Sequence, residues 1–220
     1  MKENNKRLNC KDVFNAFLVK DASYSDDLYE MPIIHYENTI PKKLIPFSKC
    51  LRSKEYDAWI HFYEDDYNFE RVWRNPKKYL PIIKKFAGII TMDFSVYRDM
   101  PFPMQVWQIY RSRALGFWFQ KNGIKVIVNM RYGDERTFNI CCNGVPKNSI
   151  ISIGSHGCIK DKEDRQIFIS GLDFIIKELK PHTIIVYGSA PNKIFDLYRN
   201  MQINIIVYDS EFSKSHRGKN

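Results

Sequence analysis

The segment Gly154-Ser155-His156-Gly157-Cys158 holds the side chains best suited to chemistry in this sequence of 220 residues. Glycines on both sides of the histidine let the backbone turn tightly and bring the imidazole close to a ligand. His156 is therefore a candidate general acid or base, and Ser155 is a candidate ligand-binding residue beside it. The alternative interpretation is a loop histidine that is hydrogen-bonded to a neighbouring carboxylate.

Asp93 is the second candidate for proton transfer, because it stands in the sequence Met-Asp-Phe-Ser at the end of an apolar run. A carboxylate in apolar surroundings costs free energy unless it is paired or hydrogen-bonded. Arg98, Arg111 and Arg131 are candidate partners, and Arg131 is also a candidate for binding an anion. A purely structural Asp–Arg pair is the alternative, since ion-pair networks perturb carboxylates too.

Two segments suit an anionic group. In Tyr187–Pro191, Gly188 and Ser189 lead from a strand into a helix, where free amides can bind a phosphate or a carboxylate. A serine cap without any ligand is the alternative there. In Arg131–Arg136, the arginines flank the candidate ligand-binding residue Asp134, and they either hold an anion or form a salt-bridged loop. Neither a dinucleotide fingerprint nor a Walker A motif is present.

These residues must be positioned by a sheet, because short apolar runs alternate with longer amphipathic ones. Strands buried on both faces of a parallel sheet are nearly continuous in apolar residues. Ligands bind such sheets at the carboxyl ends of the strands, where Ser95 and Asn129 also fall as candidate ligand-binding residues. The predicted strands are 58–63, 88–94, 124–130, 149–154, 183–187 and 203–208.

Helical spacing and turn residues predict helices between these strands. The pattern indicates an α/β fold with a mostly parallel sheet of about six strands and helices on both faces. A partial or distorted β/α barrel is the alternative, since a complete barrel needs ~250 residues. We expect an N-terminal arm (1–57) with a short helix near 11–20, a core domain (58–212) and a basic tail (213–220). The predicted core helices span 76–86, 103–122, 161–179 and 190–201.

Composition narrows the classes of protein. The chain is 44% hydrophobic and 27% charged, which excludes disordered and collagen-like chains. Five cysteines, with no C-x-x-C pair, indicate neither a disulfide framework nor a zinc site. No apolar run approaches the ~18 residues of a membrane span, and no secretory signal is legible. We therefore expect a cytoplasmic protein that does not associate with a membrane, and we assign it no metal or cofactor.

The excess of basic residues favours a polyanionic partner. Lys and Arg number 34 against 25 Asp and Glu, which gives a formal net charge of +9. In the tail, Lys214, Arg217 and Lys219 are candidate nucleic-acid contacts, and aromatic residues such as Tyr97 are suited to stack on bases. Neither a helix-turn-helix nor a zinc finger is legible.

The sequence resembles a known family over about residues 86–213. The matching segments include G-I-I-T-M-D-F-S-V-Y-R-D-M-P, N-G-I-K-V-I-V-N-M-R-Y-G-D-E-R-T, G-S-H-G-C-I-K and T-I-I-V-Y-G-S-A-P. They are similar to bacterial and phage proteins of the domain-of-unknown-function family 4417. The family's pattern I-P-N-V-x-W is replaced here by Ile127–Tyr132, which retains Asn129. The resemblance implies a cytoplasmic protein carried by phages or other mobile elements, and it implies no particular reaction.

Two hypotheses about function follow. The first is an enzyme or ligand-binding protein that acts on a nucleotide or a nucleic-acid component, with Asp93 or His156 as acid or base. The alternative is a non-enzymatic DNA-associated factor for replication, maintenance or counter-defence of a mobile element. A module that binds a host protein is a third possibility, for which the sequence offers no test.

Overall fold

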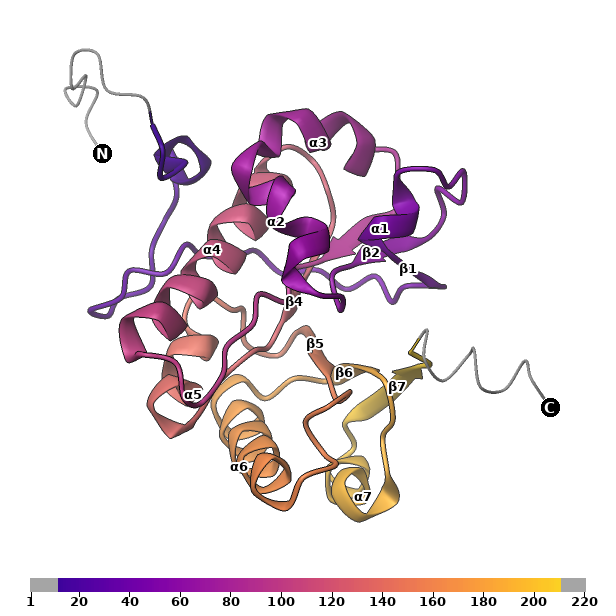
Figure 1. Cartoon of the computed structure of the whole chain (residues 1–220). Helices are drawn as coiled ribbons and strands as arrows, with labels where there is room; N and C mark the ends of the chain where they lie inside the picture. The colour runs from indigo at the N-terminus through magenta and orange to yellow at the C-terminus, as the bar shows by residue number, and fades with distance from the viewer. Residues whose placement is uncertain (1–11, 211–220) are drawn as a thin grey trace.

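The computed structural model describes residues 12–210, which form one seven-stranded sheet (Figure 1). Every strand runs parallel to its neighbour, and the strands follow one another in sequence order across the sheet. The strands are β1 (Leu44–Pro46), β2 (Trp59–His61), β3 (Gly88–Ile90), β4 (Val126–Asn129), β5 (Ile150–Gly154), β6 (Thr183–Tyr187) and β7 (Asn204–Tyr208).

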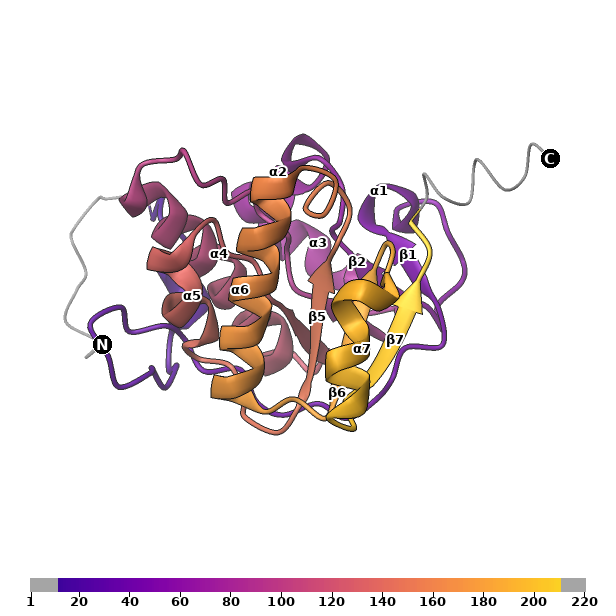
Figure 2. The same ribbon diagram turned by 90° about the horizontal axis from the view of Figure 1, so that it is seen from below.

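Helices connect the strands and lie along the outside of the sheet (Figures 1 and 2). Helix α5 starts at a capping box in which Asp134 accepts a hydrogen bond from the helix backbone, and Asp161 caps α6 in a similar way. The helices are α1 (Phe47–Cys50), α2 (Asp66–Arg74), α3 (Pro76–Ile83), α4 (Phe102–Lys121), α5 (Glu135–Cys142), α6 (Lys162–Leu179) and α7 (Asn192–Asn200).

The two faces of the sheet have separate cores. Apolar side chains on the outer face, such as Ile89 and Ile184, pack in one large cluster with residues from the helices. The inner face carries a small cluster made by strand residues alone: Trp59, Ile90, Ile127, Ile150 and Ile185. The helices therefore cover one face, and the sheet curls around its own inner side chains as a half-barrel.

This arrangement confirms the predicted α/β class and parallel sheet and corrects one detail. A doubly wound sheet, with helices on both faces, needs a point at which the strand order reverses. The order here runs from β1 to β7 without reversal, so the partial barrel describes the sheet. The sheet also has one strand more than expected, because β1 lies within the segment predicted as an arm.

The segment before β1 is tied to the rest of the chain. A 3-10 helix, Ala16–Val19, is shorter than the helix predicted there, and Phe17 packs edge-on against Trp118 of α4. Residues 35–41, here named the strap, then pass the amino ends of the strands. The strap contacts Gln120 at the end of α4, and His182 just before β6. Tyr208 of β7 donates a hydrogen bond to the carbonyl of Pro41, which links the last strand to the chain ahead of the first.

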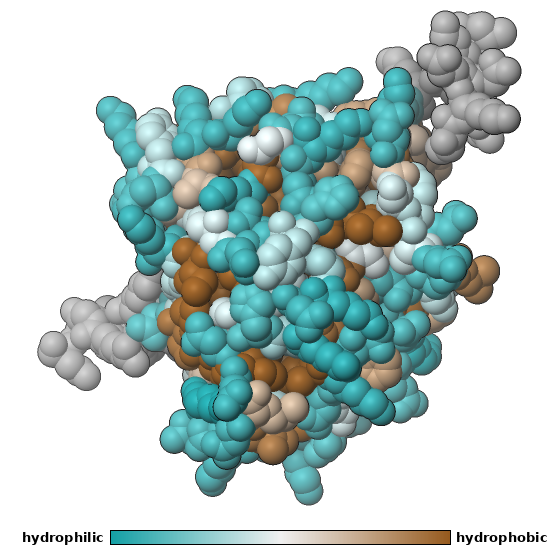
Figure 3. All heavy atoms as spheres, turned by 180° about the vertical axis from the view of Figure 1, so that it is seen from behind, coloured by the Kyte–Doolittle hydropathy of each residue, from teal (hydrophilic) through white to brown (hydrophobic). Residues whose placement is uncertain are grey.

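The rear face of the molecule is mainly polar. Figure 3 shows hydrophilic side chains over most of this face, with hydrophobic groups between them. Within residues 12–210, no helix has the length and apolar character needed to cross a bilayer.

Candidate functional site

A cavity of about 540 Å³ lies at the carboxyl ends of the strands, and we name it the mouth cavity. All seven strands end at its wall, so residues that are far apart in sequence meet there. The lining from or just after successive strands includes Pro46, Tyr63, Asp93, Arg131, Gly154, Tyr187 and Ser210. This is the position that the strand pattern predicted for a ligand site in an α/β fold.

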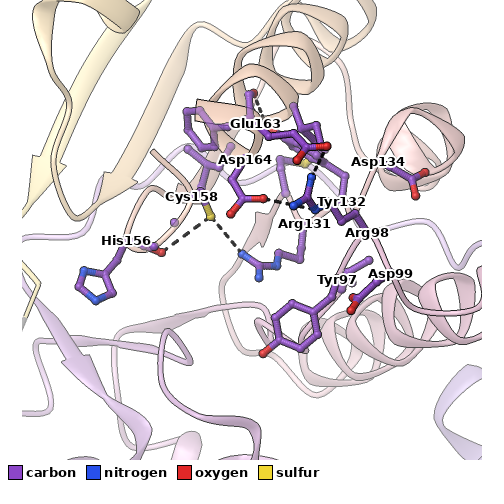
Figure 4. A pocket seen from close by; sticks show the side chains of 18 residues that line it. Tyr97, Arg98, Asp99, Arg131, Tyr132, Asp134, His156, Cys158, Glu163 and Asp164 are labelled. Atoms are coloured by element: carbon purple, nitrogen blue, oxygen red, sulfur yellow. Dashed lines mark hydrogen bonds and ion pairs between the residues drawn. The ribbon is translucent and has the colours of Figure 1, made fainter. Parts of the chain in front are cut away.

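A second cavity of about 910 Å³ adjoins it, between the loops that follow β3, β4 and β5, and we name it the side cavity (Figure 4). The two cavities share Tyr97, Arg131, Gly154 and His156 in their walls, and together they are called the cleft below. The lining of the side cavity combines charged residues with apolar ones such as Ile153 and Phe168. Both volumes fall in the range of pockets that bind small molecules, ~300–1,000 Å³.

Asp93 is held by two neighbouring side chains at the edge of the mouth cavity. Its Oδ1 accepts a hydrogen bond of 2.7 Å from Nδ2 of Asn129 and lies 4.0 Å from Nε of Arg131. Burial raises the pKa of the Asp93 carboxyl above its usual value, while the charge of Arg131 and the Asn129 hydrogen bond oppose that rise. Asp93 therefore holds a proton more readily than an exposed aspartate does.

Arg131 forms the wall between the two cavities and has unused hydrogen-bonding capacity. Its Nη1 donates to Sγ of Cys158 at 3.6 Å, whereas its buried Nε has no hydrogen-bond partner among the described residues. Burial lowers the pKa of Arg131, but the negative charge of nearby Asp93 raises it by more. The pKa therefore lies above the usual value for arginine. The guanidinium thus stays charged in the wall of the cleft.

A buried hydrogen-bond chain behind Asp93 fixes its position. Oδ1 of Asn129 accepts a hydrogen bond of 2.9 Å from the hydroxyl of Tyr63. The same hydroxyl lies 2.7 Å from Oγ of Ser152, and the Tyr63 ring stacks on Tyr187 with centroids 4.7 Å apart. Burial raises the pKa of Tyr63 well above its usual value, so the hydroxyl stays protonated and able to donate.

Tyr63, Ser152 and Tyr187 were not among the predicted site residues. The available signal was alternation along strands: Tyr63 is two residues beyond His61 and four beyond Trp59, on the inner face of the sheet. Similar spacing places Ser152 and Gly154 on the inner face of β5.

The structure brings several predicted residues together. Asp93, Ser95, Arg131 and His156 all line the mouth cavity, and Asn129 lies directly behind Asp93. Ser95 is bound to Asp66, which accepts hydrogen bonds from its amide and its hydroxyl. His156 is exposed at the rim, and its ring points away from Arg131 (Figure 4).

The predicted site residues Asp134 and Ser155 use their side chains to bond neighbouring parts of the fold. Asp134 lines the side cavity but caps α5 and pairs with Arg136, which lowers the pKa of Asp134 through a side-chain hydrogen bond. Ser155 is buried and donates to the carbonyl of Ser189, so it joins the loops after β5 and β6.

The predicted anion-binding residues Gly188 and Ser189 do not line the cleft. Gly188 has φ +119° and packs against Ser155, and neither Gly188 nor Ser189 lines the mouth cavity or the side cavity. Helix α7 begins after Pro191 without a side-chain cap, so Ser189 is not its N-cap. The predicted contacts Lys214, Arg217 and Lys219 lie outside the described residues.

The cleft is acidic although the chain is basic. Seven acidic and three basic side chains line its two cavities, which gives the lining a formal charge of −4 against +9 for the whole chain. No group of three or more His, Cys, Asp or Glu side chains in the described part of the chain is arranged to hold a metal ion. The acids are Glu64, Asp65, Asp93, Asp99, Asp134, Glu163 and Asp164, and the bases are Lys49, Arg98 and Arg131.

The fold and the cleft define an α/β half-barrel protein with its candidate site at the carboxyl ends of the strands. The chain belongs to the DUF4417 family, a domain of unknown function whose model matches residues 23–209. This confirms the resemblance seen in the sequence and extends it toward the N-terminus.

Two phage proteins are similar to the chain. The "Gene 1 protein" of Mycobacterium phage D29 is 34% identical over 179 residues, covering 80% of this chain and 66% of the phage protein. The chain thus spans slightly less than two thirds of that relative. The "Gene 1 protein" of Mycobacterium phage L5 is 33% identical, covering 80% of this chain and 78% of the phage protein. No solved structure matches the chain.

Proposed function

We propose that this DUF4417 protein binds a nucleotide or another nucleic-acid component in the cleft and exchanges a proton with it through Asp93. The observation that carries the proposal is the pairing of Asp93 with Arg131. A carboxylate and a guanidinium lie 4.0 Å apart at the strand ends, beside two cavities, and the guanidinium Nε has no hydrogen-bond partner among the described residues.

A nucleobase suits this pair because its edge carries hydrogen-bond donors and acceptors side by side. A carboxylate accepts from the N–H groups of a base, whereas a guanidinium donates to its ring nitrogens and carbonyl oxygens. Tyr97 adds an aromatic ring to both cavities and is half-exposed, so one ring face is available for stacking.

Asp93 is the proposed acid or base. A general base works best when its pKa approaches the operating pH, and burial moves the pKa of Asp93 in that direction. The Asn129–Tyr63 chain holds the carboxyl in place while a proton moves. His156, at the rim of the same cavity, is the proposed second proton-transfer group.

Arg131→Gln tests the binding part of the proposal. We expect the variant to bind its ligand about 10–100-fold more weakly, because a charge-assisted hydrogen bond is worth roughly 1.5–3 kcal/mol. The measurement is calorimetric titration with the common nucleosides and their 5′-monophosphates. Arg199→Gln is the matched control, since Arg199 pairs with Asp196 on α7 and does not line the cleft. Equal affinity of wild type and Arg131→Gln, or no binding of any of these compounds by the wild type, contradicts the proposal.

The charge distribution also favours the second hypothesis, a DNA-associated factor. Because the cleft lining is acidic, the excess of basic side chains belongs to residues that do not line the cleft. We expect affinity for a 30-base-pair duplex to fall steeply as salt rises from about 50 to 200 mM, through counterion release. Fluorescence anisotropy measures it, with the triple substitution K214A/R217A/K219A as the comparison. Absence of binding at low salt rejects this hypothesis.

A further inference from the structure

The electrostatics of the cleft do not suit a phosphate group. Like charges repel, and the repulsion is several-fold stronger near a protein surface than in bulk water. A phosphate dianion inside the cleft would meet an excess of four carboxylates over basic side chains.

The basic side chains of the cleft offer little compensation. Arg98 is already paired with Glu163 at 2.5 Å and with Asp164 at 3.6 Å, and Arg131 faces Asp93. The third basic side chain, Lys49, lines only the mouth cavity. Both basic side chains that line the side cavity are therefore already paired with carboxylates.

The same cleft suits a flat, uncharged group. Tyr97, which is half-exposed, lines both cavities, and apolar residues such as Ile153 and Phe168 line the side cavity with it. A nucleobase has the shape for this space and the polar edge for Asp93 and Arg131. Outside the cleft, the described residues carry 24 Lys and Arg against 16 Asp and Glu, so basic side chains are in excess there.

We infer that the cleft takes a nucleobase that is still part of a polynucleotide, while the phosphates on either side remain outside the cleft. This inference rests on the proposed function and narrows its substrate class. Proteins that act on a base within a chain move that base into a pocket and leave the backbone outside. An acidic cleft in a chain of net charge +9 combines the two requirements, because the base enters without its phosphates and the phosphates stay outside the cleft, where basic side chains are in excess.

The test uses nine-unit oligonucleotides built from abasic spacers with one central base, in DNA and RNA forms, each of the common bases being tried. The control strand is fully abasic. We expect one base to raise affinity about tenfold over the abasic strand, the gain typical of a single stacked base. The corresponding free nucleoside should bind no more weakly than its 5′-monophosphate, because the cleft gains nothing from the phosphate.

Tyr97→Ala should abolish the difference between the one-base and abasic strands, and Tyr97→Phe, which keeps the ring, should retain it. Tyr36→Ala is the matched control: Tyr36 is 50% exposed against 53% for Tyr97, but it contacts His182 at the amino ends of the strands. A monophosphate that binds as tightly as the one-base strand, in a Tyr97-dependent manner, overturns the inference and leaves the proposed function intact. If no base-containing compound binds in a manner that depends on Tyr97 or Arg131, both fail.

Discussion

Asp93→Asn is expected to retain ligand binding and to lower turnover by about 10²–10⁴-fold, the usual contribution of a positioned acid or base. The amide has nearly the same shape and accepts a hydrogen bond from Asn129 as the carboxylate does, but it cannot take up the proton. Turnover is measured by mass spectrometry on whichever base-containing compound binds in the titrations. Asp173→Asn is the control, because Asp173 accepts a hydrogen bond from Tyr198 on the outer side of the fold. Unchanged turnover in Asp93→Asn would remove Asp93 from the chemistry.

The raised pKa of Asp93 also predicts how the stability of this variant depends on pH. When the folded-state pKa lies above the unfolded value, the group's contribution to stability is complete below the unfolded pKa and is lost as pH rises through the folded pKa. Asp93→Asn carries no such loss, so its stability relative to wild type should improve from acid to neutral pH. Urea unfolding at several pH values measures this. A variant that becomes relatively less stable toward neutral pH would show that Asp93 serves mainly to pair with Arg131.

Trp59→Ala is expected to lower the free energy of unfolding by about 3–5 kcal/mol, the cost of removing a large aromatic side chain from a core. Trp59 is only 1% exposed and is the largest member of the inner cluster. Its ring lies over Gly88 so closely that a Cβ at position 88 would stand 2.7 Å from it. Since Gly88 has no side chain, nothing on that neighbour can fill the space that the indole leaves.

Chemical denaturation measures the effect, and Trp107→Ala provides the comparison. Trp107 is 39% exposed on α4, where it stacks on Tyr110, so the same substitution should cost much less there. Trp59→Phe should recover part of the loss. Equal losses at positions 59 and 107 would mean that the inner cluster does not contribute to stability as a core.

Much of the fold could be predicted because most of the strands are apolar, and β2 to β6 are buried almost throughout. Five continuous apolar runs coincide with β3 to β7, and the predicted strand 183–187 matches β6 at both ends. The order of the strands in the sheet was not predictable in this way, since an apolar run does not identify its neighbour. Strand β1 was missed because its three residues, Leu44–Pro46, carry too short a pattern.

Helices α2 and α5 were missed for a different reason. Each is short and follows a run of charged residues that is typical of a loop. The signals were present but weak: Phe69, Val72 and Trp73 follow helical spacing in α2, and Asp134 and Thr137 form the capping box of α5.

The candidate site was partly predictable. The rule that ligands bind at strand carboxyl ends places Asp93, Ser95, Arg131 and His156 around one cavity. It does not distinguish a side chain that faces the cavity from one that bonds the neighbouring loop, as Ser155 does. That difference depends on the turn after each strand, which the sequence pattern does not specify.

The hydrogen bond from Tyr208 to Pro41 is also among the last contacts that can form while the chain is being synthesised. It joins residues 167 positions apart, whereas each strand pairs with the strand that precedes it in the chain. Strands β1 to β6 can therefore associate as synthesis proceeds, but the contact of the strap with β7 must wait until the last strand has been made. At roughly 5–20 residues per second, Pro41 waits on the order of ten to thirty seconds for its partner. The hydrogen bond between Tyr208 and Pro41 thus forms only at the end of synthesis.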